Sequence, residues 1–213
     1  MLRSPLLAPL ALAALAVLAA PGAATACMNG VERRVDPTTR SIRAAEELLA
    51  DGKHRAAVRE VLEAFPTALR ADYRDHRTSL FDRGQRVIAL AVVRSGGGLR
   101  LDADLPGKTA AEREAGLAWA TMILRLHRAR GNGGVLLTSE LAEALALRPS
   151  ERPAAHAMLK ELADGDIMPT ARSWAILGGL EQARGDRDAA ARAVARCKEI
   201  SPDPNQCELV DDA

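Results

Sequence analysis

The hydrophobic and polar positions after residue 26 follow a helical period, and alternating strand-like patterns are almost absent. The segment SIRAAEELLADGKHRAAVREVLEAFP places apolar residues three and four apart on both sides of Asp51–Gly52. It therefore predicts two amphipathic helices joined by a turn, with Pro66 disfavouring continuation of the second. The next apolar run, RGQRVIALAVV, predicts a short helix or a buried segment that ends in the flexible break SGGG.

The second half of the chain continues this helical pattern. Thr109 and Glu112 have the spacing of a capping box and predict the start of a long helix that stops at GNGG. SELAEALAL and PAAHAMLKELA predict two shorter helices, and residues 171–204 predict a final pair. The stretch LRLDADLPGK, before the long helix, predicts a loop or a small extended segment. We expect an all-α domain over residues 37–200, followed by a C-terminal tail at 201–213.

The final pair has the most informative sequence, ARSWAILGGLEQARGDRDAAARAVARCKEISPDP. Trp174, Leu177 and Gly178 are spaced to share one helix face, and the missing side chain at Gly178 would let a neighbouring helix approach closely. Gly185 is expected to end the first helix, because glycine adopts a left-handed backbone easily. Asp186 is expected to cap the second helix.

The second helix of this pair should pack through small residues. Ala190, Val194 and Cys197 are predicted to form its inward stripe, and Pro202 is predicted to terminate it. This order resembles the tetratricopeptide repeat, in which Trp, Leu-Gly, Gly, Ala and Pro recur at fixed offsets over about 34 residues. The sequence departs from that pattern at Glu181 and Val194, where aromatic residues are usual.

The resemblance implies a short α-solenoid of antiparallel helical hairpins, irregular in the middle, whose concave groove holds a peptide or a partner protein. Residues 38–66 match the pattern at Gly52 and Ala57, and residues 134–168 have the spacing of a degenerate unit. Trp119 is a candidate for the same slot as Trp174, although the two lie 55 positions apart in the sequence. An irregular helical bundle stays open as the alternative.

The first 26 residues have the organisation of a bacterial-type secretory signal peptide. Arg3 precedes the apolar run LLAPLALAALAVLAA, and the segment ends in Ala24-Thr25-Ala26. We expect the mature chain to begin at Cys27, with a linker over 27–36, and to be exported to the periplasm, the cell envelope or the medium. Two interpretations of Cys27 stay open, ordinary cleavage after Ala26 and a lipid anchor. The usual Leu three residues before a lipidated cysteine is missing.

The other two cysteines suggest a cross-link. In an oxidising compartment Cys197 and Cys207 could close a small loop through KEISPDPNQ and hold the C-terminal tail against the last helix. The alternative is that Cys197 is simply a small core residue, because it lies on the apolar face of its helix.

Charge and composition argue against nucleic acid as a partner. The formal net charge is +1, and only 2% of the residues are aromatic. Nucleic-acid-binding proteins usually combine a basic stripe with stacking aromatic side chains. Charges of both signs are interspersed here, which is typical of solvated helix faces, and a membrane contact is expected only through a lipid at Cys27.

No motif indicates catalysis. His54, His76, His127 and His156 are dispersed and lack metalloprotease spacing. The PGKT at 106–109 lacks the earlier glycine of a phosphate-binding loop, Ser95 lacks the context of a nucleophile elbow, and DADLPG and DGD lack the ligand series of a calcium loop. We expect no catalytic residue, metal or cofactor. The sequence predicts a non-catalytic extracytoplasmic protein that binds a protein or peptide partner, or alternatively a structural subunit or lipoprotein of an envelope assembly.

Overall fold

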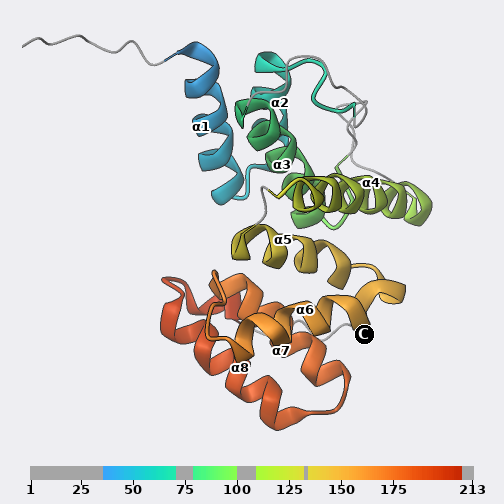
Figure 1. The fold of residues 1–213 in the computed structure, drawn as a ribbon, viewed down its shortest axis with the longest axis vertical. Helices are drawn as coiled ribbons and strands as arrows, with labels where there is room; N and C mark the ends of the chain where they lie inside the picture. Colours follow the sequence, from blue (N-terminus) through green and yellow to red (C-terminus); the bar gives the residue numbers. More distant parts are fainter. Residues whose placement is uncertain (1–35, 71–78, 100–108, 132–133, 208–213) are drawn as a thin grey trace, which may run out of the picture. The chain divides into compact units, whose positions relative to one another are not determined.

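The computed structural model describes residues 36–70, 79–99, 109–131 and 134–207. These residues form eight α-helices and two short 3-10 helices without any strand, so the expected all-α fold is confirmed for this part of the chain (Figure 1). The predicted signal peptide, Cys27 and most of the LRLDADLPGK stretch lie outside the described residues. None of the described helices is long and apolar enough to cross a membrane.

The first two helices form the hairpin that the sequence predicts. Helix α1 covers Pro37–Ala50 and helix α2 covers His54–Ala64. The side chain of Asp36 caps α1 by accepting a hydrogen bond from the amide of Thr39. Gly52 makes the turn with a φ of +73°, a left-handed conformation that glycine adopts without steric cost.

The next pair begins with a helix that has a long buried segment. Helix α3 covers Ser79–Arg94, which is longer than the apolar run, and every residue of 87–93 is buried. Helix α4 covers Ala110–Ala129 and begins with the predicted capping box, in which Thr109 and Glu112 bond each other's backbone amides. This confirms the predicted helix start at Thr109.

The SGGG segment after α3 is a close packing point, so the expectation of a flexible break is wrong. Gly97 is buried, its φ is +75°, and a Cβ added there would overlap the backbone carbonyl of Arg113 in the first turn of α4. Gly116, one turn further along α4, also lies against the backbone of Gly97. The missing side chains therefore let the end of α3 and the start of α4 touch through their backbones.

The third pair begins earlier than expected. Helix α5 covers Val135–Ala146, which adds one turn before SELAEALAL. The 3-10 helix η1 (Pro149–Glu151) leads into helix α6 (Arg152–Asp164). Residues 139–145 of α5 are all buried, including two glutamates, so this helix has protein on all of its sides.

The last pair agrees closely with its prediction. Helix α7 covers Ala171–Ala183, helix α8 covers Arg187–Ile200, and Gly185 has a φ of +85° between them. The carboxylate of Asp186 accepts from the amide of Ala189 and caps α8. Thr170 caps α7 in the same way, and this N-cap was not among the predicted ones.

The inward face of α8 differs in one residue from the predicted stripe of Ala190, Val194 and Cys197. Its buried residues are Ala190, Ala193 and Cys197, whereas Val194 is only half-buried. Val194 is one position past Ala193, which rotates it to the edge of the packed face. There it lines a surface hollow with Lys198. On α7, Trp174, Leu177 and Gly178 are all buried, in agreement with a shared inward face.

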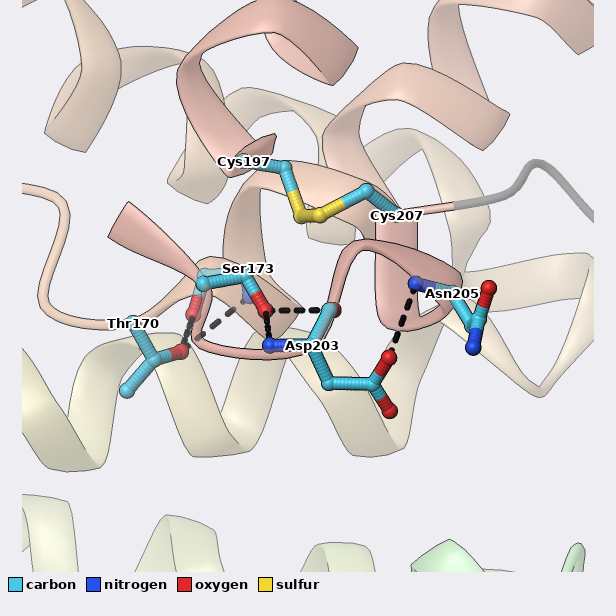
Figure 2. Close-up of a disulfide and its surroundings, with 7 residues drawn as sticks. Thr170, Ser173, Cys197, Asp203, Asn205 and Cys207 are labelled. Atoms are coloured by element: carbon cyan, nitrogen blue, oxygen red, sulfur yellow. Dashed lines mark hydrogen bonds between the residues drawn. A yellow bond between two sulfur atoms is a disulfide. The ribbon is translucent and has the colours of Figure 1, made fainter. Parts of the chain in front are cut away.

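A disulfide fastens the C-terminal tail to the last helix. Cys197 of α8 and Cys207 are bonded, with their Cα atoms 5.7 Å apart, and both are fully buried (Figure 2). The 3-10 helix η2 (Pro204–Cys207) contacts both α7 and α8. Asp203 orders the segment that leads to Cys207, since its carboxylate accepts a hydrogen bond from the amide of Asn205. The segment is therefore anchored to the last hairpin through Cys207 and the contacts of η2.

The helices pack in a regular succession. Each helix contacts its hairpin partner, and each hairpin contacts the next one along the chain. The odd-numbered helices also contact one another in order, α1 with α3, α3 with α5 and α5 with α7. Among the described elements, no even-numbered helix contacts another even-numbered one. The odd-numbered helices thus form a continuous inner row.

The structure accounts for two irregular positions in the repeat pattern. Trp119 lies on α4, the second helix of its hairpin, so it does not occupy the slot of Trp174 on the first helix of its own pair. Its indole N–H instead donates to the backbone oxygen of Leu69 at 3.3 Å. Glu181, at a usual aromatic position, pairs with Nε2 of His156 at 2.8 Å and so joins α7 to α6 through polar atoms.

Candidate functional site

A set of arginine–glutamate ion pairs joins the four odd-numbered helices. We call it the ion-pair ladder, and its seven residues are Glu46, Arg83, Arg86, Arg94, Glu140, Glu143 and Arg172. The pairs link α1 with α3, α3 with α5, and α5 with α7. The ladder therefore runs along the same row of helices that contact one another in succession.

The first two steps of the ladder are bidentate. Arg83 donates to Glu46 through Nε at 2.9 Å and through Nη2 at 2.5 Å. Arg86 donates to Glu140 through the same two nitrogens at 2.6 and 2.5 Å. The hydrogen bond with each carboxylate raises the pKa of each guanidinium further above its ordinary value. Such fork-shaped pairs fix orientation as well as charge.

The last step brings two arginines to one carboxylate. Arg172 of α7 and Arg94 of α3 both donate from Nε to Oε1 of Glu143 on α5, Arg94 at 3.3 Å. The Glu143 side chain is only 6% exposed, whereas 48% of the Arg172 side chain is exposed. One negative charge lies beneath two positive ones at this end, so the surface there is cationic.

The buried glutamates depend on these arginines. The Glu140 side chain, like that of Glu143, is 6% exposed, and an ionised carboxylate at that depth is costly unless it is paired and hydrogen-bonded. Removing one partner of a buried pair leaves the other charge uncompensated. The two glutamates of α5 therefore require α3 and α7 to stay in register with α5.

A surface hollow lies next to the cationic end of the ladder. Its volume is about 540 Å³, and residues from the start of α2 and from the segment after α3 line it, among them Lys53, His54, Arg55 and Leu99. Burial lowers the pKa of the His54 imidazole below its ordinary value, and the positive charges of Arg94 and Arg172 lower it further against the opposite effect of Glu143. The charges at this end of the ladder therefore act on the imidazole of His54.

The residues on which the repeat resemblance rests lie elsewhere, in the packing and the turn of the last hairpin. Trp174, Leu177 and Gly178 are buried on α7, while Gly185 and Asp186 form the turn to α8. The guanidinium of Arg196 lies 5.6 Å from the ring centroid of Trp174. None of these residues belongs to the ladder. Pro202 follows the end of α8 as expected.

The histidines are held in separate places. His156 pairs with Glu181, and Nδ1 of His127 lies 3.8 Å from Oδ1 of Asp82. His54 lies at the hollow, and His76 falls outside the described residues. Within the part of the chain that the structure describes, no group of three or more His, Cys, Asp or Glu could hold a metal ion.

The ladder is not among the predicted features, because charges interspersed along a helix are typical of solvated faces. One signal was available. Glu140 and Glu143 interrupt a segment, VLLTSELAEALAL, that is apolar around its whole circumference. Acidic residues on a helix without a polar face indicate buried carboxylates, and buried carboxylates need cationic partners.

Comparison with known proteins adds no relative, because no family model, curated protein or solved structure matches this chain.

Proposed function

We propose that this chain is a non-catalytic, extracytoplasmic helical-repeat protein that binds a protein or peptide partner on the face of its odd-numbered helices. The observation that carries the proposal is the ordered contact of α1, α3, α5 and α7, with the ion-pair ladder along them. A curved stack of hairpins brings the helices on its concave side closer together than those on its convex side, and the concave side forms the binding surface. The arrangement favours a short α-solenoid over an irregular helical bundle.

The leader sequence supports the location. Export and the start of the mature chain at Cys27 rest on the signal-peptide pattern of residues 1–26. Intact-mass measurement of the protein from its cell envelope tests both. A chain that still begins at Met1 would overturn export, and an added mass equal to a lipid group would identify the lipoprotein form.

Site-resolved cross-linking tests the binding face. A photoreactive amino acid is placed at Arg43, which is exposed on α1 one turn before Glu46, and in a second variant at Arg192, which is exposed on α8. We expect illumination of intact cells to yield a partner adduct from position 43 and none from position 192. Adducts of equal yield from both positions, or from position 192 alone, would contradict the proposed face.

Size-exclusion mass of the purified protein separates this proposal from the structural alternative. A binding module should be monomeric when purified, whereas an obligate subunit of an assembly should not.

A further inference from the structure

The cationic end of the ladder differs from its other steps in the number of arginines that meet one carboxylate. Elsewhere one arginine meets one glutamate, but Arg94 and Arg172 share Glu143. A guanidinium has five N–H donors, and Arg172 uses its Nε on the shared carboxylate. With almost half of its side chain exposed, Arg172 offers further donors at the surface.

The hollow beside this end continues the same charge. Lys53, His54 and Arg55 stand at the start of α2, where helix amides point outward, and no side chain caps them. Cations at a helix N-terminus oppose the helix dipole, which favours anions there. Asp51 pairs with Lys53 at 3.0 Å but is itself exposed. Among the described residues that line the hollow, Lys53 and Arg55 are cationic and none is acidic, while Arg94 and Arg172 share the single carboxylate of Glu143.

We propose that this end of the odd-helix face, from the hollow at His54 to Arg94 and Arg172, binds an acidic segment of the partner polypeptide. The proposal rests on the proposed function and names the chemistry of the partner. Carboxylates along the segment would take the remaining arginine N–H donors and the free amides of α2.

The dimensions favour an extended chain over a single small anion. Arg86 and Arg94 are eight residues apart on α3, which is about 12 Å along a helix. An extended peptide covers that distance in about four residues. Arg86 keeps its Nη1 donors after its bidentate bond to Glu140, and 32% of its side chain is exposed. Acidic residues about four positions apart would therefore reach both arginines.

A pair of labelled peptides tests the proposal. The probe is a fluorescein-labelled, twelve-residue glycine–serine peptide in which every fourth residue is glutamate, and its control carries glutamine at the same positions. Fluorescence anisotropy with the full mature protein should show binding of the glutamate peptide that is at least tenfold tighter than that of the control and that weakens as NaCl is raised.

Variants locate the site. Arg172→Ala should weaken glutamate-peptide binding about fivefold, and Arg55→Ala, on the rim of the hollow, should weaken it about threefold. Arg192→Ala, an exposed arginine on α8, should leave it unchanged. Because Arg55 is exposed and outside the ladder, its variant reports on the site even where Arg172→Ala affects folding.

Several results would overturn the proposal. These are equal binding of the two peptides, binding of neither, unchanged affinity in both Arg172→Ala and Arg55→Ala, or stronger binding of a single-stranded oligonucleotide than of the glutamate peptide. The cross-link from position 43 does not depend on charge. If that adduct forms while the peptides fail, the binding face stands and only the acidic chemistry falls.

Discussion

Replacing Gly97 by alanine should be far more damaging than the same change at Gly96. Both glycines have left-handed backbones, with φ of +75° and +61°. An L-residue in that region costs about 1–2 kcal/mol, and alanine returns about 0.4–1 kcal/mol by reducing the entropy of the unfolded chain. Gly96→Ala should therefore lower the free energy of unfolding by about 1 kcal/mol, because an added Cβ at Gly96 meets no atom within 4 Å.

At Gly97 a steric cost adds to the same backbone cost. The added Cβ would overlap the carbonyl of Arg113, and backbone in the first turn of a capped helix cannot turn aside as a side-chain end can. Overpacking typically costs about 1–3 kcal/mol. Gly97→Ala should thus lower the free energy of unfolding by about 2–4 kcal/mol.

Urea unfolding of the two variants, followed by far-ultraviolet circular dichroism, measures both values. The matched backbone conformation makes the difference between them a direct measure of the α3–α4 contact. Losses that agree within about 0.5 kcal/mol, which is the usual additivity error, would refute the close approach of SGGG to α4.

Three further predictions concern the last hairpin and the ladder. Gly178→Leu should lower the free energy of unfolding by about 1–3 kcal/mol, because Gly178 is buried. Gly179→Leu should raise it by up to about 1 kcal/mol, because a Cβ there meets nothing within 4 Å. A thermal unfolding midpoint that is higher for Gly178→Leu than for Gly179→Leu would contradict this. Glu143→Gln should cost about 1.5–3 kcal/mol, because it removes the charge that two partly exposed arginines share, and a loss below about 1 kcal/mol in urea would show that the pairing is dispensable. Reduction of the Cys197–Cys207 disulfide should cost about 2–3 kcal/mol, and two alkylatable thiols in the native exported protein would contradict the bond.

The local parts of the fold were predictable from the sequence. Thr109 with Glu112, and Gly185 with Asp186, determine helix ends through contacts that span three residues or fewer. Such signals depend on backbone hydrogen bonds within one turn, so no knowledge of the tertiary structure is needed to interpret them. For the same reason the bounds of the last hairpin were predicted closely.

The ladder could not be predicted because its partners are far apart in the sequence. Arg86 and Glu140 are 54 residues apart, and nothing local specifies that α3 and α5 lie side by side. The prediction of a flexible break at SGGG was wrong for a related reason. Its glycines are equally suited to a flexible loop and to a close backbone contact, and only the position of Arg113 distinguishes the two.

The two buried glutamates of α5 restrict how the number of hairpins in this protein can change during evolution. In an array of identical units, a hairpin can be duplicated or lost because every junction has the same two surfaces. Here α5 supplies the two buried acids of the ladder, and α3 and α7 supply only bases to them. Deleting the α5–α6 hairpin would bring Arg86 and Arg94 to face Arg172, and duplicating it would set one copy's buried glutamates against the other's. Either change would need compensating substitutions on a neighbouring helix, so length variation should be found at the ends of the stack before it is found at α5.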